Sequence, residues 1–226
     1  MSSQKLSVYN LKINGEISWS SLIEKLLLCN VEEERFIINE QSETYIGGYY
    51  MIETVHNQIQ YNSNNNNFEQ IPVKRINIIK FDIYTLKSTI LLWGSKKVIP
   101  FFLTAVEKAS DYSIILDYRE SDFKKMIESL LTDPIIVFNN MRITDLVIEN
   151  GIVANCSVNL RILDDSREMV KKYISKLSQV GVSVGEQESA VSMTIYSSGA
   201  VVVYKDRDDI SYEVMDTLNK MLGGVM

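Results

Sequence analysis

The chemistry open to this chain is limited first by its single histidine, His56. Histidine is the usual general base near neutral pH, so a hydrolase triad would have to recruit His56. That residue ends a strand-like run beside a polar stretch, a setting that favours a surface or turn position. The glycine motifs of nucleotide-binding proteins and serine hydrolases are also missing. The sequence therefore predicts no catalytic residue and favours a non-enzymatic role.

The acidic residues form two clusters, Asp164 with Asp165 and a second one over residues 206–209. A metal-dependent nuclease needs two or three carboxylates that converge from strand ends. Each cluster instead precedes a predicted helix, where carboxylates accept hydrogen bonds from free N–H groups and complement the helix dipole. The sequence therefore favours capping over catalysis. It predicts no bound metal and no cofactor, and it makes a nuclease the least favoured function.

Two cysteines, Cys29 and Cys156, lie far apart in apolar runs. A structural zinc site needs four ligands, which two cysteines and one histidine cannot supply within one chain. We predict that both are buried free thiols.

Basic residues occur in adjacent pairs that could contact phosphate groups. The formal charge of −6 excludes a uniformly basic coat but leaves room for a local basic patch. Aromatic residues on the predicted strands could stack on bases if they face solvent, namely Tyr84, Trp93, Tyr196 and Tyr204. The candidate nucleic-acid contacts are Lys74, Arg75, Lys96, Lys97, Lys124, Lys125, Lys171 and Lys172.

The spacing of apolar residues predicts the strands and helices that position these residues. Along the chain, segments with strand-like spacing alternate with segments of helical spacing. An asparagine-rich run over residues 61–68 predicts a loop and the best internal boundary. We expect an N-terminal α/β segment over residues 1–68 and a second region over residues 69–226, which could form one continuous domain. Helical spacing occupies residues 18–28, 96–109, 121–131, 166–179 and 208–222.

Three stretches share the order strand, turn, strand, helix, and they start near Lys74, Met141 and Ser189. In the first and third, residues 81–85 followed by 89–93 parallel residues 193–197 followed by 200–204. A hairpin has one apolar face that the following helix can cover. The predicted fold class is therefore α+β, with an antiparallel or mixed sheet built from repeated units and helices packed on one face. Chance recurrence of this common motif is the alternative to duplication.

A sheet of this kind leaves one face or edge open, which favours binding. We expect a non-enzymatic binding or assembly protein that self-associates or belongs to a larger complex. The alternative is a nucleic-acid-binding protein of a prokaryotic mobile element, phage or defence system. The first residues lack the apolar core of a signal peptide, and no apolar run approaches about 20 residues. We therefore expect a soluble, cytoplasmic protein with no membrane partner.

Overall fold

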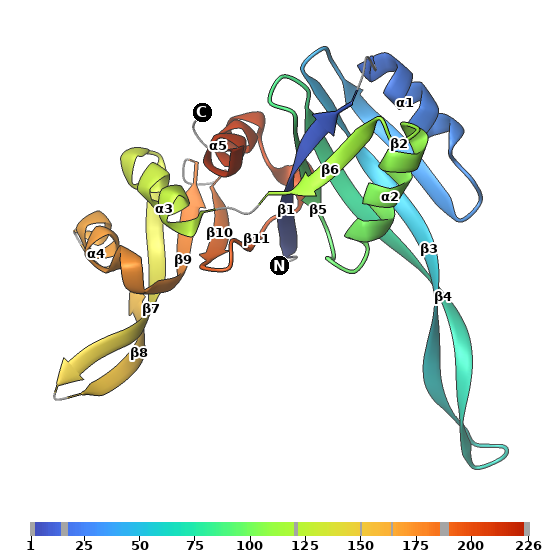
Figure 1. The fold of residues 1–226 in the computed structure, drawn as a ribbon. Helices are drawn as coiled ribbons and strands as arrows, with labels where there is room; N and C mark the ends of the chain where they lie inside the picture. Colours follow the sequence, from blue (N-terminus) through green and yellow to red (C-terminus); the bar gives the residue numbers. More distant parts are fainter. Residues whose placement is uncertain are drawn as a thin grey trace. The chain divides into compact units, whose positions relative to one another are not determined.

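The computed structural model describes residues 3–14, 18–119, 122–149, 151–163, 165–185 and 190–223. It is an α+β structure in which antiparallel strands predominate, in agreement with the predicted class (Figure 1). The chain divides into two compact units: unit 1 comprises Met1–Val8 with Tyr118–Met226, and unit 2 comprises Tyr9–Asp117. Strand β1 (Gln4–Ile13) contributes residues to both. Among the described helices, none has the length and apolar character needed to cross a bilayer.

Unit 2 is an antiparallel sheet packed against two helices. Residue Ser18 caps the first helix as its hydroxyl accepts a hydrogen bond from the N–H of Ser21 at 3.1 Å. The ring of Phe102, on the second helix, contacts rings from three strands at the centre of the core. The elements are α1 (Trp19–Leu28), β2 (Glu34–Gln41), β3 (Tyr45–Asn62), β4 (Asn67–Tyr84), β5 (Thr89–Trp93), α2 (Ile99–Ala109) and β6 (Ile114–Tyr118). Strands β2 to β5 lie in chain order, and β6 pairs with β1.

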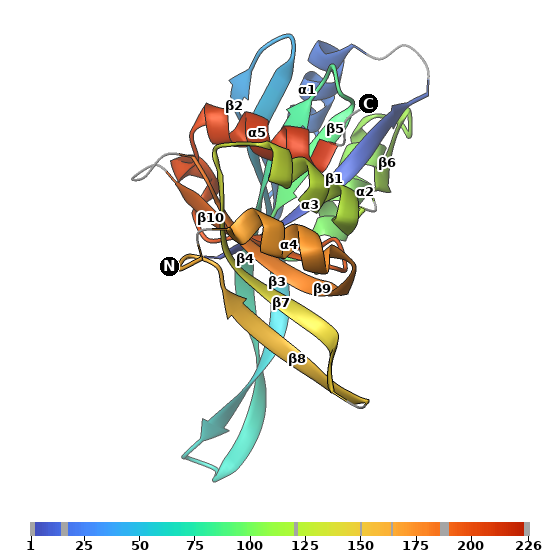
Figure 2. The same ribbon diagram turned by 90° about the vertical axis from the view of Figure 1, so that its left-hand side faces the viewer.

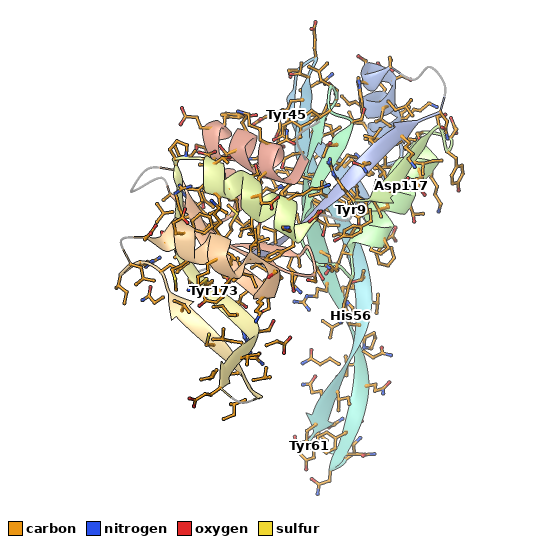
Figure 3. All side chains as sticks on the ribbon, turned by 60° about the vertical axis from the view of Figure 1, so that its left-hand side comes forward. Tyr9, Tyr45, His56, Tyr61, Asp117 and Tyr173 are labelled. Atoms are coloured by element: carbon orange, nitrogen blue, oxygen red, sulfur yellow. The ribbon has the colours of Figure 1, made fainter. Side chains whose placement is uncertain are left out.

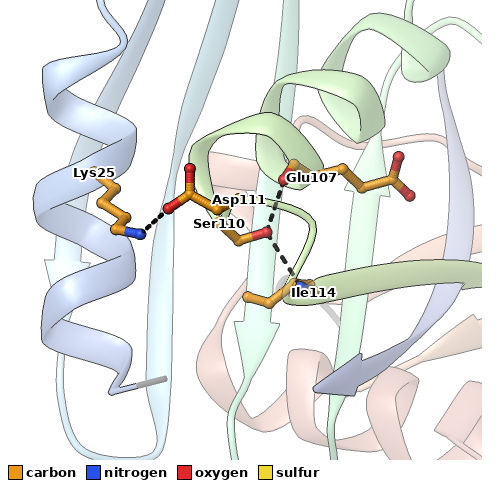
Figure 4. Close-up of polar contacts among 5 residues, drawn as sticks. All are labelled: Lys25, Glu107, Ser110, Asp111 and Ile114. Carbon is orange, nitrogen blue, oxygen red and sulfur yellow. Dashed lines mark hydrogen bonds and ion pairs between the residues drawn. The ribbon is translucent and has the colours of Figure 1, made fainter. Parts of the chain in front are cut away.

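A compact polar turn ends α2 and directs the chain into β6 (Figure 4). The hydroxyl of Ser110 donates to the Glu107 carbonyl at 2.9 Å and accepts from the N–H of Ile114 at 3.2 Å. Residue Asp111 has a positive φ of 52°, and its carboxylate pairs with Lys25 of α1 at 2.5 Å. This turn therefore joins the two helices at the same place where the strand begins.

Two adjacent glycines in β3 shape the edge of unit 2. A side chain at Gly48 would lie 2.2 Å from the carbonyl oxygen of Ile37, so only glycine allows this approach of β2. The pairing of β2 with β3 shifts register opposite the glycines, between Ile38 and Glu40. The extra residue at this irregularity lies on β2, opposite the glycines.

Unit 1 is also built on antiparallel strands. Their order is β11, β10, β9, β7, β8, and β11 pairs with the first residues of β1. Figure 2 shows the helices of this unit beside its strands. The elements are α3 (Phe123–Thr132), β7 (Ile136–Glu149), β8 (Ile152–Asn159), α4 (Ser166–Tyr173), β9 (Leu177–Val184), β10 (Val191–Tyr196), β11 (Val201–Val203) and α5 (Tyr212–Gly223).

The side chain of Arg167 ties α4 to the chain around α3. Its guanidinium donates to the carbonyls of Leu131, Asp133 and Ile136 at 2.6 to 2.7 Å. It also lies over the Phe138 ring, 5.6 Å from the ring centre. Helix α4 therefore packs on the same face of the unit 1 sheet as Phe138.

The predicted helix over residues 166–179 is wrong in its second half. Helix α4 ends at Tyr173, and strand β9 begins at Leu177. Alternating valines at positions 180, 182 and 184 are buried and favour the strand, while Gly181 lies within it rather than ending a helix. A side chain at Gly181 would lie 2.6 Å from the Asn140 amide, so this glycine is needed for close packing.

Two smaller predictions also need correction. The asparagine-rich loop is shorter than expected, because β3 continues to Asn62 and β4 begins at Asn67. The expected boundary at residue 68 thus lies near the tip of a hairpin. The thiols are not buried either: Cys29 is exposed after α1, and Cys156 is half-buried on the outermost strand.

Candidate functional site

The most prominent feature of unit 2 is a two-stranded arm, formed by residues 53–62 of β3 and 67–76 of β4. The two strands pair without a register shift from Tyr45↔Tyr84 to Asn62↔Asn67. Strand β2 pairs with β3 only as far as Ile52, and β5 pairs with β4 only from Lys80. Figure 1 shows the arm extending beyond α1 and α2. Neither outer edge of the arm is paired with a further strand among the described residues.

The two faces of the arm differ in composition. Side chains alternate along paired strands, so the continuous register assigns each residue to a face. On one face most side chains are apolar and exposed, with exposures of 66% for Ile59 and 69% for Phe68. We call this the apolar face; it consists of Val55, Asn57, Ile59, Tyr61, Phe68, Gln70, Pro72 and Ile76, with Glu53 and Lys74 at its base.

The opposite face is more polar. It carries Thr54, His56, Gln58, Gln60, Glu69, Ile71, Val73 and Arg75. Closer to the core, the same face holds Tyr50 and Ile79, which are fully buried with the side chains of α1 and α2. The apolar face therefore continues the sheet surface that is turned away from those helices.

The apolar face is also nearly neutral. Its two charged residues pair with each other, with Lys74 Nζ 2.6 Å from a Glu53 carboxylate oxygen. The hydrogen bond to Glu53 raises the pKa of Lys74. At the tip, the rings of Tyr61 and Phe68 pack with centres 5.3 Å apart (Figure 3). The face thus presents an apolar strip with an aromatic end.

The single histidine lies on the opposite face of the arm (Figure 3). Its Nε2 is 2.9 Å from the Thr54 hydroxyl, and its side chain is exposed. Catalytic use of histidine requires an orienting group and a water-excluding cleft. His56 has the Thr54 hydroxyl as a partner but is exposed to solvent, which agrees with the surface position expected from the sequence.

Unit 1 has a different candidate surface, a row of hydrogen-bonded polar side chains. The Nε of Arg161 donates to the Asn139 Oδ1 at 3.0 Å, and the Asn139 amide donates to Ser183 Oγ at 2.7 Å. The hydroxyls of Ser183 and Ser192 are 3.0 Å apart. Both serines alternate with the buried valines of β9 and β10. This polar row therefore lies on the face opposite Phe138 and α4.

Aromatic residues extend the same face of unit 1. The hydroxyl of Tyr204 is 3.2 Å from that of Thr194. Burial, together with Tyr204, raises the pKa of Tyr196. Of the aromatic residues considered for base stacking, Tyr204 is 39% exposed, whereas Trp93 is 1% exposed. Stacking by Trp93 is therefore excluded, because its indole is buried and donates to Asp82 at 2.6 Å.

The basic pairs lie on four separate segments. Residues Lys74 and Arg75 lie in the arm, and Lys96 and Lys97 precede α2. Residues Lys124 and Lys125 lie on α3, next to Glu128 and Asp122 respectively. The last pair, Lys171 and Lys172, is on α4, the helix that packs on the Phe138 face. None of the eight belongs to the polar row.

A side-chain cap is present at one of the two acidic clusters. Residue Asp206 accepts a hydrogen bond from the N–H of Asp208 at 3.2 Å and caps a short 3-10 helix, Arg207–Asp209, whereas α5 begins only at Tyr212. Residue Asp165 occupies the N-cap position of α4 without a side-chain hydrogen bond to the helix, and Asp164 lies outside the described residues. In the described ranges, no three acidic, histidine or cysteine side chains gather to hold a metal ion.

The sequence comparisons offer no relative from which a role for these surfaces could be taken. No protein-family model matches the chain, and no curated protein matches it in sequence. The sequence signal for the arm is the alternation of Val55, Asn57, Ile59 and Tyr61, which continues past the expected end of the strand. The polar row has no comparable signal, because its members come from distant parts of the chain.

Proposed function

We propose that this chain is a non-enzymatic binding protein that assembles with another protein through the apolar face of its arm. The observation that carries the proposal is the row of exposed apolar side chains on one face of a ribbon that no described residue covers. Contiguous exposed apolar surface of this kind marks interaction sites in soluble proteins.

The two-stranded backbone of the arm also supports partner binding. A two-stranded ribbon is only marginally stable in water without a third strand or a packed face. Ten residues on each side give the arm a length of about 34 Å. A partner that packs on the apolar face would remove Val55, Ile59 and Ile76 from water and order the ribbon.

The composition of the apolar face favours a protein over a nucleic acid as the ligand. Protein interfaces are enriched in aromatic residues and depleted of charge at their centre. Tyr61 and Phe68 provide the aromatic anchor, and the Glu53–Lys74 pair leaves no net charge. Nucleic-acid surfaces need unpaired cations for phosphate contacts.

Co-purification from the native cells tests this function. We expect the variant Val55→Ser/Ile59→Ser to lose a partner that wild-type protein retains. The matched control, Gln58→Ser/Gln60→Ser, alters the same strand on the opposite face and should retain it. Retention of the same partner by both variants, at equal folded stability, would contradict the proposal.

A second candidate function is nucleic-acid binding on the open face of unit 1. It is favoured by the polar row, where Arg161, Asn139 and Ser192 present hydrogen-bonding groups beside the exposed Tyr204 ring. Nucleic-acid binding there should weaken steeply with salt and fall in Arg161→Gln, while Lys124→Gln on α3 leaves it unchanged. Absence of binding to DNA and RNA at low salt would remove this candidate.

An internal duplication is the proposed origin of the three hairpin-and-helix stretches. Their order is β4–β5–α2, β7–β8–α4 and β10–β11–α5. In the first and third, a residue with positive φ precedes the return strand, namely Ser88 at 47° and Gly199 at 77°. This shared turn geometry supports the sequence resemblance between the two stretches.

We also propose a reducing, cytoplasmic setting. Both cysteines are free, and Cys29 is exposed. Exposed free thiols are typical of compartments in which disulfides do not persist.

A further inference from the structure

Strand β8 forms the outer edge of the unit 1 sheet and has no charge, proline or extra residue of its own. The two register shifts in its pairing place the extra residues on β7. It pairs with β7 alone, and no residue that the structure describes covers its other side. All eight of its residues are uncharged, and none is proline. Exposed edges with free N–H and C=O groups pair readily with further strands unless charge, proline or a bulge prevents it.

Strand β2, at the other end of the strand order from β8, shows the contrast. Strand β2 is also eight residues long and pairs with β3 alone. It carries Glu34, Arg35 and Glu40, and its pairing is interrupted by a register shift. Charge and an extra residue within the edge strand itself disfavour further pairing, and β8 carries neither.

The geometry points to a second copy of this chain as the occupant of the β8 edge. We infer that two β8 strands pair antiparallel about a two-fold axis, which joins two unit 1 sheets into one. In this arrangement the same residues meet on both copies. A neutral strand can meet itself without like-charge repulsion, whereas β2 would place its charged residues near their own copies.

Symmetry fixes which side chains meet. A two-fold axis perpendicular to the sheet keeps each face on its own side. Facing residues therefore lie an even number of positions apart, and the pairing is centred on one residue that faces its own copy. Centred on Cys156, the register places Asn155 opposite Ser157 and Ala154 opposite Val158. These side chains are small or β-branched and lie on matching faces.

The number of hydrogen bonds is sufficient for a specific contact. Alternate residues of a strand direct their N–H and C=O groups outward, so two copies of this eight-residue strand form about eight hydrogen bonds. Exposed apolar residues near the hairpin end, including Ile152 and Val153, lie beside the contact. This interface is separate from the arm and does not depend on the proposed function.

Sedimentation equilibrium of the full chain tests the inference. Wild-type protein should form a dimer that dissociates on dilution. The variant Val153→Lys/Ser157→Lys brings like charges together and should raise the dissociation constant at least about tenfold, equivalent to about 1.4 kcal/mol. The matched control, Ile37→Lys/Gln41→Lys, adds the same charges at the same spacing on β2 and should leave the dimer unchanged.

Hydrogen exchange gives a second readout on the unaltered chain. The outward amides of β8 should become protected as protein concentration rises, while those of β2 do not change. A wild-type monomer at all concentrations, a dimer that survives the β8 lysines, or concentration-independent exchange in β8 would each overturn the inference. None of these results would affect partner binding through the arm.

Discussion

At the scale of single residues, the most constrained polar group in unit 2 is the carboxylate of Asp82. It is 1% exposed, and it accepts from the Tyr45 hydroxyl at 2.5 Å and from Trp93 Nε1 at 2.6 Å. The Tyr45 ring crosses Gly47 to reach it, where a side chain would lie 2.4 Å from the hydroxyl. These contacts fix the strands from which the arm extends.

Removal of this carboxylate should destabilise the chain. We expect Asp82→Ala to lower the free energy of unfolding by about 2 to 3 kcal/mol, because the Trp93 N–H would stay buried without its acceptor. The variant Asp82→Asn keeps one acceptor and should lose less. Urea denaturation monitored by fluorescence measures both, and equal stability of wild type and Asp82→Ala would refute the role given to Asp82.

The tip of the arm should respond to acid through Glu69. Hydrogen bonds from the Asn62 and Asn65 amides lower the pKa of this exposed carboxyl group. A carboxyl group with a lowered pKa in the folded state stabilises that state above its usual titration range, about pH 4 to 5. This contribution is lost as the pH falls through the folded-state pKa.

NMR of the side-chain amides of Asn62 and Asn65 measures this effect. Their signals should shift together as the pH is lowered, and Glu69→Gln should abolish the shift without changing the rest of unit 2. Identical titration in the wild type and in Glu69→Gln would show that another group controls the tip.

At the scale of elements, periodicity predicted most strands and helices, and it failed where two patterns overlap. Val170, Leu177 and, just beyond the predicted helix over residues 166–179, Val180 follow helical spacing, although the last two belong to strand β9. Only packing against β7 and β10 selects the strand. The length of the arm was underestimated because asparagines favour turns locally, whereas cross-strand pairing continues the ladder to Asn62.

Only part of the candidate surfaces could be predicted from the sequence. The apolar residues of the arm were visible as alternation, but their exposure depends on where β2 and β5 end. The polar row unites Asn139, Arg161 and Ser183, which only the tertiary fold brings together. The lysine pairs were conspicuous in the sequence, yet the fold distributes them over separate elements.

Hydrogen exchange should resolve the arm from the sheet that carries it. Amides of residues 53–62 should exchange faster than those of residues 46–52, because only the latter pair on both sides. Binding of a partner to the apolar face should slow exchange in the arm selectively. Equal protection along the whole of β3 in the free protein would contradict the arm as described.

At the scale of the whole molecule, the proposed contacts use three separate surfaces. Unit 2 carries the arm, whose apolar face fits a protein partner. Unit 1 carries the β8 edge, which fits a second copy, and the polar row, which favours nucleic acid only as a second candidate. Strand β1 connects both units through its own residues.

Site-specific photo-crosslinking in the native cells shows which face of the arm a partner touches. A photoreactive amino acid is placed either at Ile59 on the apolar face or at Gln58, its neighbour on the opposite face of the same strand. The account predicts a discrete crosslinked protein from position 59 and none from position 58. Crosslinks of equal yield from both positions, or from neither, would contradict docking on the apolar face.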